Sequence, residues 1–308
     1  MEWSSMLKEI LTPFDEPHSR LYITNLISTF ILVQVWFWLR CCRHQRQEKN
    51  RVISTKKWIK MMSLIFFNKK YWFCRSSLID FGLFIFNGFL KALLLGFFLQ
   101  LSFFIARLLI HLGDDVQTFF DFELHVSTSQ TNIFLFTLFA FIMDDFLRFF
   151  QHYLSHRIPL LWQLHRVHHT ATVLTPFTLY RTHPVESLLN STRNALSLGV
   201  STGLFVLIFD SPLTLWTLAG VNAFGYLFNF LGANLRHSQI PLSFGRWEHF
   251  FISPRQHQIH HGMSPECYQK NFGVTLAIWD YLLGSLTLSS AVSKKLQFGL
   301  NEMNGQSH

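Results

Sequence analysis

Long apolar runs with few charges constrain the fold of this chain more than any other feature. A helix that spans a bilayer needs ~20 mostly apolar residues. Five segments meet or approach this requirement, namely Leu21–Leu39, Leu78–Leu109, Thr131–Phe150, Ala195–Phe209 and Leu213–Leu235. Only 14% of the residues are charged, whereas soluble domains carry about 25%. The pattern predicts an all-α, polytopic integral membrane protein with about four to five transmembrane helices.

The basic residues predict how the chain is oriented. Lys and Arg are concentrated in the stretch Arg40–Arg75, directly after the first apolar run. Cytoplasmic loops carry such an excess, and it attracts anionic headgroups, so nucleic acid is not an expected partner. The loop His111–Gln130 holds four acidic residues and no Lys or Arg, which predicts that it lies on the other side of the membrane. This topology puts the chain's histidine motifs on the cytoplasmic side.

The histidines, 16 in all, are concentrated in a few motifs. In chain order these are HxxxH (His152, His156), HxxHH (His165, His168, His169), two single residues (His183, His237) and a second HxxHH (His257, His260, His261). Spacings of three and four residues place side chains on one face of a helix. Neutral imidazole suits iron, copper, nickel or zinc, and this many ligands exceed the need of one ion. The motifs therefore predict a site for two metal ions.

Other functions account for parts of this pattern. A haem-binding membrane electron-transfer protein would need paired histidines well separated within the spans. A metal transport protein would need exchangeable ligands near the bilayer midplane. A zinc hydrolase would need a positioned general base, and the sequence contains no HExxH motif. The histidine motifs lie beside the predicted spans, which favours a catalytic dimetal site on a cytoplasmic helical cap.

The ordered motifs between Ile142 and Leu286 resemble the fatty acid hydroxylase/sterol desaturase superfamily of membrane histidine-box diiron enzymes. The series is Asp145 before HYLSH, then HRVHH, Tyr180-Arg-Thr-His183-Pro-Val-Glu186, Leu235-Arg-His237-Ser, HQIHH, Asn271-Phe-Gly273 and Trp279-Asp280. The segment His183-Pro-Val-Glu186 is most similar to the sterol C5-desaturase and C4-methyl oxidase branches. The residues between His261 and Asn271 match no particular branch, so the substrate class stays open.

The resemblance implies a non-haem centre of two irons that hydroxylates or desaturates a sterol, fatty acyl or related lipid with O2. The metal ligands that it implies are His152, His156, His165, His168, His169, His237, His257, His260 and His261. His183 matches a family histidine that is either a ligand or an outer partner. A ligating histidine usually donates its other ring N–H to a carboxylate or a carbonyl. Asp145 is the favoured carboxylate, and Glu186 and Asp280 are further candidates.

The expected organisation has three parts. Residues 1–130 form the N-terminal membrane segments and the basic loop, residues 131–290 the catalytic domain, and residues 291–308 a tail. The sequence contains no GxGxxG motif, no cysteine cluster and no cytochrome b5-like segment. Electrons are therefore expected from a separate donor of the cytochrome b5 or ferredoxin type with its reductase. The expected location is a bacterial inner membrane or the endoplasmic reticulum.

Overall fold

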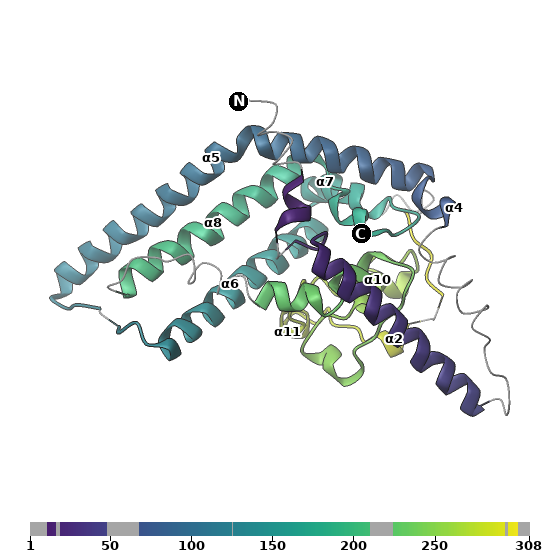
Figure 1. The fold of residues 1–308 in the computed structure, drawn as a ribbon. Coiled ribbons are helices and arrows are strands. Elements are labelled where there is room, and N and C mark those ends of the chain that lie inside the picture. Colours follow the sequence, from purple (N-terminus) through teal and green to yellow (C-terminus); the bar gives the residue numbers. More distant parts are fainter. Residues whose placement is uncertain are drawn as a thin grey trace.

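The computed structural model describes residues 11–16, 19–47, 68–124, 126–209, 224–292 and 295–300. The regular elements in these ranges are helices, with only two isolated β-bridges, so the predicted all-α class is confirmed for them. Three long helices project in one direction from a cap of short helices (Figure 1). They are α5 (Arg75–Phe120), α6 (Gln130–Arg157) and α8 (Pro184–Ile208).

The cap is built from short elements, and several of them begin with proline. Proline suits the first helical position because its fixed φ matches the helix and its missing N–H is not needed there. Such starts occur in α7 (Pro159–His169), η1 (Pro176–Tyr180), α10 (Pro254–His260) and η4 (Pro265–Cys267). The other short elements are α4 (Lys69–Trp72), η2 (Ala233–His237), η3 (Gly245–His249), α11 (Ile278–Leu282) and η5 (Ser289–Ala291). Helix α2 (Ile23–Gln47) is not short, since its 25 residues equal the length of α8.

Helices α5 and α8 pack closely through small residues. A Cβ added at Gly199 would lie 2.6 Å from the backbone oxygen of Ser102, and one at Gly203 would lie 2.9 Å from that of Ala106. Glycine spaced four residues apart lets two helix backbones approach in this way, an arrangement frequent between membrane helices. Near the far end of the pair, Gly113 packs against Leu207. The pair therefore stays in contact along much of α8.

The prediction of a loop over residues 111–130 is wrong for the first half of that range. Helix α5 continues to Phe120 and therefore includes Asp114 and Asp115. Packing of Gly113 on α8 accounts for the extra turns, because it adds tertiary contact where the apolar pattern ends. The helix stops at Asp121, whose left-handed backbone (φ 52°) lets its N–H reach the carbonyl groups of Gln117 and Thr118. The polar linker is consequently short.

Other predicted segments end differently or lie outside the described residues. The first apolar run continues through residue 47 as α2, and most of the basic stretch, residues 48–67, is outside the described ranges. The turn predicted at residues 210–212 is outside them too. Residues 224–230 are helical, and the chain then turns into η2. The number of membrane spans therefore remains a prediction.

Helix α5 is, among the described residues, the one helix long and apolar enough to cross a membrane. A shorter apolar stretch occupies Ile23–Leu39 of α2. Large side chains of α5 such as Phe97, Phe103 and Phe104 are exposed, unlike those of a soluble core helix. Its 46 residues extend to about 70 Å at 1.5 Å per residue, more than the ~30 Å hydrocarbon layer.

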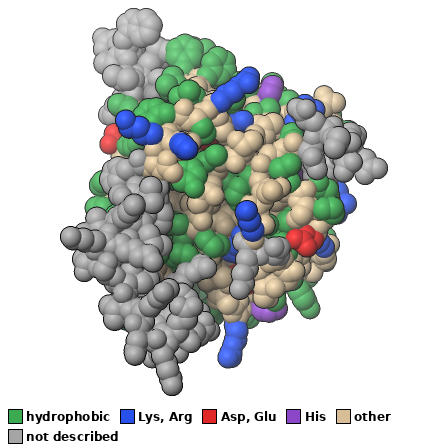
Figure 2. Space-filling model, turned by 90° about the vertical axis from the view of Figure 1, so that its right-hand side faces the viewer, with side chains coloured by type: hydrophobic (Ala, Val, Ile, Leu, Met, Phe, Trp, Pro, Cys, Tyr) green, Lys and Arg blue, Asp and Glu red, His purple; other side chains and the backbone are tan. Residues whose placement is uncertain are grey.

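The face of the molecule at the right-hand side of Figure 1 differs from the exposed apolar surface of α5. Basic side chains lie scattered among apolar and neutral ones there (Figure 2).

Candidate metal centre

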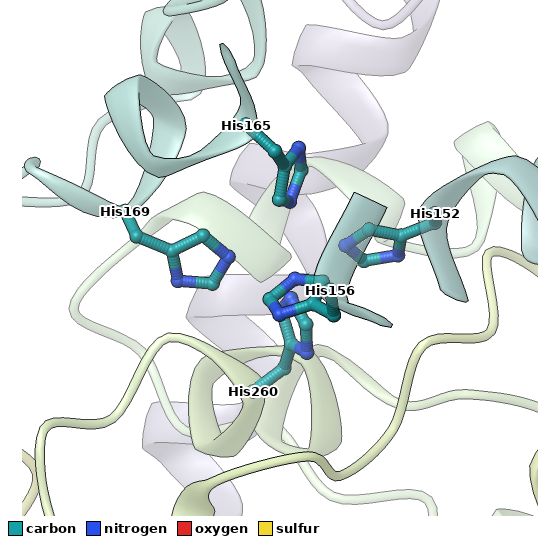
Figure 3. A group of neighbouring side chains, drawn as sticks. All are labelled: His152, His156, His165, His169 and His260. Atoms are coloured by element: carbon teal, nitrogen blue, oxygen red, sulfur yellow. The ribbon is translucent and has the colours of Figure 1, made fainter. Parts of the chain in front are cut away.

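Nine buried or half-buried histidines meet in the cap as two adjacent clusters. The five-histidine cluster comprises His152, His156, His165, His169 and His260. The four-histidine cluster comprises His168, His237, His257 and His261. Within each cluster one ring nitrogen per residue lies within 4.8 Å of all the others. Figure 3 shows the five rings of the first cluster pointing toward a common centre.

These residues come from four separate elements. The last turns of α6 supply His152 and His156, and α7 supplies the HRVHH histidines. The 3₁₀ turn η2 supplies His237, and α10 with its C-cap supplies the HQIHH histidines. A capping box between Ser253 and Gln256 fixes the start of α10. The cap thus brings together residues that lie up to about a hundred positions apart in the chain.

Each HxxHH motif divides its histidines between the two clusters. The rings of His165 and His169 enter the five-histidine cluster, whereas His168 enters the other. In the second motif His260 enters the five-histidine cluster, whereas His257 and His261 enter the other. The clusters touch, because the ring centroids of His169 and His261 are 4.6 Å apart. The two groups therefore form one continuous site with two centres.

The donor set suits metal ions better than hydrogen bonding alone. The Nε2 atoms of His156, His165, His169 and His261 are buried and have no hydrogen-bond partner among the described residues. Such unpartnered buried nitrogens are costly unless something binds them. In the four-histidine cluster, Nε2 of His237 lies 3.3 Å from Nε2 of His168 and 3.0 Å from Nε2 of His257. A neutral ring carries a single N–H, so it cannot donate to both neighbours. The residues present therefore fit two bound cations.

Partners of the other ring nitrogens orient the rings. Nδ1 of His152 donates to the Phe272 carbonyl at 2.7 Å, and Nδ1 of His260 donates to the Lys270 carbonyl at 2.8 Å. A carbonyl only accepts, so the proton is on Nδ1 and the Nε2 lone pair points into the cluster. Nδ1 of His168 approaches the Arg181 carbonyl at 3.3 Å. These bonds hold the rings as ligands would require.

Among the described residues, Glu186 is a carboxylate that contacts a histidine of the clusters. Its Oε1 lies 2.6 Å from Nδ1 of His165, and both side chains are buried. It stands in the first turn of α8, two residues after Pro184. A carboxylate in this position makes the imidazole a stronger donor to a metal.

Asp145 does not contact a histidine, in contrast to the expected direct role. Its carboxylate accepts from the backbone N–H groups of Thr275 and Leu276 and from the indole N–H of Trp279, at 2.9 to 3.0 Å. The reason is geometric, because the buried side chain points from α6 toward the loop that precedes α11. It therefore holds the loop that carries the Phe272 carbonyl.

Asp280 holds the same loop from the other end. It accepts from the N–H groups of Phe272 and Gly273 at 2.8 and 2.7 Å and from the Ser285 hydroxyl at 2.5 Å. Burial raises the pKa of Asp280 above its usual value, although these hydrogen bonds oppose the rise. Asp145 and Asp280 thus position His152 indirectly, through the loop backbone.

His183 lies outside both clusters. Its Nδ1 accepts from the N–H of Val185, so the residue caps the start of α8. Among the other histidines, His111 and His249 are exposed.

Sequence reasoning missed the role of Asp80. Its Oδ1 accepts from the Arg181 guanidinium at 2.9 Å, and its Oδ2 accepts from the Thr178 hydroxyl at 2.7 Å. The side chains of Asp80 and Arg181 are almost fully buried. Their ion pair connects η1 and the backbone of Arg181 to α5. An acidic residue inside an otherwise apolar segment was the available signal, because a charge there needs a partner.

Burial lowers the pKa of seven clustered histidines and so favours the neutral form, which binds metals; they are His152, His156, His168, His169, His237, His257 and His261. It lowers the pKa of His168 to about 3, with neighbouring His165 adding to the effect. Burial also lowers the pKa of His237 and His261, with His168 as the next cause for both.

These pKa shifts predict acid sensitivity of the metal-free protein. Unfolded histidines take up protons near pH 6.5, whereas the buried ones do not, so the unfolded state gains protons first as the pH falls. Their contribution to stability is complete above about pH 6.5 and is lost progressively below it. We expect the Tm of the metal-free protein to be level between pH 8 and 7 and to fall between pH 6.5 and 5. A Tm that rises on acidification contradicts this.

Two cavities adjoin the clusters. The smaller, of about 310 Å³, is lined by histidines of both clusters, including His152, His165, His168, His237 and His257. The larger, of about 550 Å³, lies between α6, α8 and residues 224–230, with Phe136, Phe141 and Phe205 among its walls. Arg20, Arg148, Leu179, Tyr180, Asn194 and Val274 line both, so the cavities are neighbours. Together they provide a space that runs from an apolar helix bundle to the histidines.

Comparison with known proteins gives matches over the half of the chain that holds this site. Residues 137–285 match the family described as fatty acid hydroxylase. The alkylglycerol monooxygenase of Homo sapiens is 28% identical over 161 residues, which is 52% of this chain and 32% of that protein. That of Danio rerio is 29% identical over the same length. The ornithine lipid hydroxylase of Rhizobium tropici is 29% identical over 144 residues, 47% of this chain and 39% of that protein.

Each match covers only part of this chain and part of the matched protein. The chain spans about a third of the length of the alkylglycerol monooxygenases that it matches. No solved structure matches the chain. The matched residues include both HxxHH motifs and the helices α7, α8 and α10.

Proposed function

Because residues 137–285 of the chain belong to the fatty acid hydroxylase family, we propose that it is a membrane-bound oxygenase that hydroxylates a lipid at a pair of irons. The observation that carries the proposal is the meeting of nine inward-facing histidines in two touching clusters. Five and four imidazoles would hold two ions and would leave coordination positions open on them, as catalytic sites require.

The proposed reaction balances as O2 plus a C–H bond, two electrons and two protons, giving an alcohol and water. The irons, when bound, supply the activation of O2 and the removal of hydrogen. The protein holds the ligands through Glu186 and the loop carbonyl groups and places the substrate in the smaller cavity, which touches both clusters. Burial of the site excludes bulk water from the reacting group.

Hydroxylation is favoured over desaturation by the names of the relatives, which are monooxygenases and a hydroxylase. The motif resemblance to sterol desaturases remains a separate prediction. The substrate is proposed to be a lipid that enters from the bilayer, since the larger cavity lies between helices whose outer faces are apolar.

A haem-binding electron-transfer protein is the alternative from another class. Five imidazoles around one centre would occupy the equatorial positions that a porphyrin needs, which disfavours this alternative. A metal transport protein is disfavoured because the clusters lie in the cap and at the cap end of α6, and not midway along the long helices.

The decisive experiment is metal analysis of detergent-purified protein, combined with lipid profiling of cells with and without the gene. We expect about two irons per chain and a lipid that gains one oxygen atom. Stoichiometric haem with a Soret band, or a single zinc, would overturn the proposal. A product that has lost two hydrogens would instead identify a desaturase.

Glu186→Gln is expected to weaken iron binding about 10- to 100-fold. Glutamine keeps the size of the side chain but removes the charge that strengthens His165 as a ligand. Iron retention during dialysis against a chelator measures the effect. The matched control is Glu266→Gln, at an exposed position, which should retain iron like the wild type. Equal retention in both variants would contradict the role given to Glu186.

We propose that the clusters face the cytoplasm of a bacterial inner membrane or the endoplasmic reticulum. The polar end of α5, near Asp121, lies at the opposite end of the long helices from the cap (Figure 1). In intact cells, a membrane-impermeant thiol reagent is expected to label Glu123→Cys and not Glu266→Cys. The reverse pattern would invert the orientation.

Electrons are proposed to come from a separate cytochrome b5 or ferredoxin with its reductase. The basic stretch Arg40–Arg75 gives an acidic donor a complementary charge. Turnover with a purified donor should then fall as the salt concentration rises, and a salt-independent rate would contradict docking by charge.

A further inference from the structure

Arginine side chains gather around the two cavities beside the histidines. Arg20 and Arg148 line both cavities, and Arg193 and Arg236 line the smaller one. Arginine rarely lines a cavity that takes a purely apolar molecule, because an unpaired cation there is costly.

Carboxylates that line the same cavities are already engaged. Asp144 pairs with Nε of Arg148 at 2.6 Å, Asp145 binds the loop backbone and Trp279, and Glu186 binds His165. The positive charge around the cavities is therefore only partly compensated within the described chain.

Several guanidinium N–H groups remain available toward the cavities. Arg193 hydrogen-bonds only to neutral amide oxygens of Gln151, Asn190 and Asn194, at 2.8 to 3.1 Å. Its Nε is buried and has no partner among the described residues. Arg148 donates from Nε to Asp144, and no hydrogen bond joins its terminal nitrogens to other described residues. The Arg20 guanidinium likewise makes none within the described ranges.

Arg236 is the most deeply buried of these arginines. It is 1% exposed, stacks over Phe228 at 4.7 Å and donates to the Ile252 carbonyl at 3.1 Å. Its Nε is buried without a partner, and no carboxylate among the described residues forms an ion pair with it. The residue lines the smaller cavity, directly beside His237. A buried cation in this state is stabilised by an anion that enters the cavity.

We propose that these arginines bind an oxyanion, a phosphate or a carboxylate, on the headgroup of the lipid that is oxidised. The planar guanidinium fork matches both groups. The phenyl rings of Phe136, Phe141 and Phe205 in the larger cavity suit the hydrocarbon part of the same molecule. The inference rests on the proposed function and narrows its substrate to amphipathic lipids that carry negative charge.

The test compares two lipids that differ by one phosphate. Purified, iron-loaded, full-length protein in a neutral detergent is titrated with 1-oleoylglycerol and with 1-oleoylglycerol 3-phosphate. The phosphorylated lipid is expected to bind about 10- to 100-fold more tightly, as one or two charge-assisted hydrogen bonds provide.

Variants link this preference to the arginines. Arg193→Gln and Arg20→Gln should each lose most of the preference, while the affinity for the neutral lipid changes less than about twofold. Arg193→Lys, which keeps the charge but not the fork, should retain part of it. Arg246→Gln is the matched control, because Arg246 is exposed on η3, and it should behave like the wild type. A Tm and an iron content equal to those of the wild type establish that each variant is folded.

Three results would overturn the inference. These are equal affinity for the two lipids, competition by inorganic phosphate as strong as by the phosphorylated lipid, and an equal loss in Arg246→Gln. The second result would identify a site for free anions, and the third a general attraction by net charge. Protein that contains two irons and hydroxylates lipid but shows no preference contradicts this inference alone. A preference in protein that binds no iron contradicts the proposed function alone.

Discussion

Replacing a single histidine in either cluster is expected to disrupt the whole centre. His260→Ala removes a ligand from the five-histidine cluster, and His237→Ala removes one from the four-histidine cluster. We expect each variant to bind at most one iron and to lose more than about 100-fold in product formation, since even outer partners of a metal site are worth 10- to 100-fold. Iron per chain, measured on purified protein, and product formation in cells give the two readouts.

His249→Ala provides the matched control, because His249 is an exposed histidine of η3. It should keep two irons and full activity. His183→Ala separates two interpretations of that residue. A position outside the clusters predicts normal iron content, whereas an iron content reduced as far as in His260→Ala would make His183 a ligand. Full activity in His237→Ala would contradict a centre of two irons.

Asp80→Asn is expected to destabilise the folded protein by about 3 to 5 kcal/mol, because it leaves the Arg181 guanidinium buried without its counter-charge. The side chains of Asp80 and Arg181 are 0% and 4% exposed. Solvent therefore screens the loss little. Denaturant unfolding of the metal-free protein in mixed micelles measures the change in free energy.

The control for Asp80→Asn is Asp115→Asn on the same helix, at an exposed position. It should leave the unfolding midpoint where the wild type has it. A value for Asp80→Asn within 1 kcal/mol of the wild type would mean that the ion pair contributes little to stability. Weaker iron binding should accompany the destabilisation, since the Arg181 carbonyl faces His168.

Local spacing predicted much of the site. The HxxxH and HxxHH periods placed His152 with His156, and His165 with His169, on shared helix faces, and the structure brings each pair into one cluster. Spacing alone did not predict that His168 turns to the other cluster. That division depends on how α7 and α10 are oriented in the cap, which long-range contacts decide.

The partners of buried carboxylates were harder to predict. Asp80 and Arg181 are 101 residues apart, and Asp145 reaches backbone groups 130 residues further on. No local pattern encodes such contacts. Helix ends were misplaced for a related reason, because packing of α5 against α8 extends the helix beyond its apolar run.

The division of each HxxHH motif between the two clusters has a consequence for inheritance. No continuous segment of the chain encodes one cluster alone, because HRVHH and HQIHH each contribute to both. Inserting or deleting one residue inside either motif rotates the following histidines by about 100° around the helix, so ligands of both clusters are displaced together. The two clusters are therefore inherited together. A sequence variant that loses one cluster and keeps the other requires substitutions of individual histidines, whereas a shortened or lengthened motif disrupts both clusters.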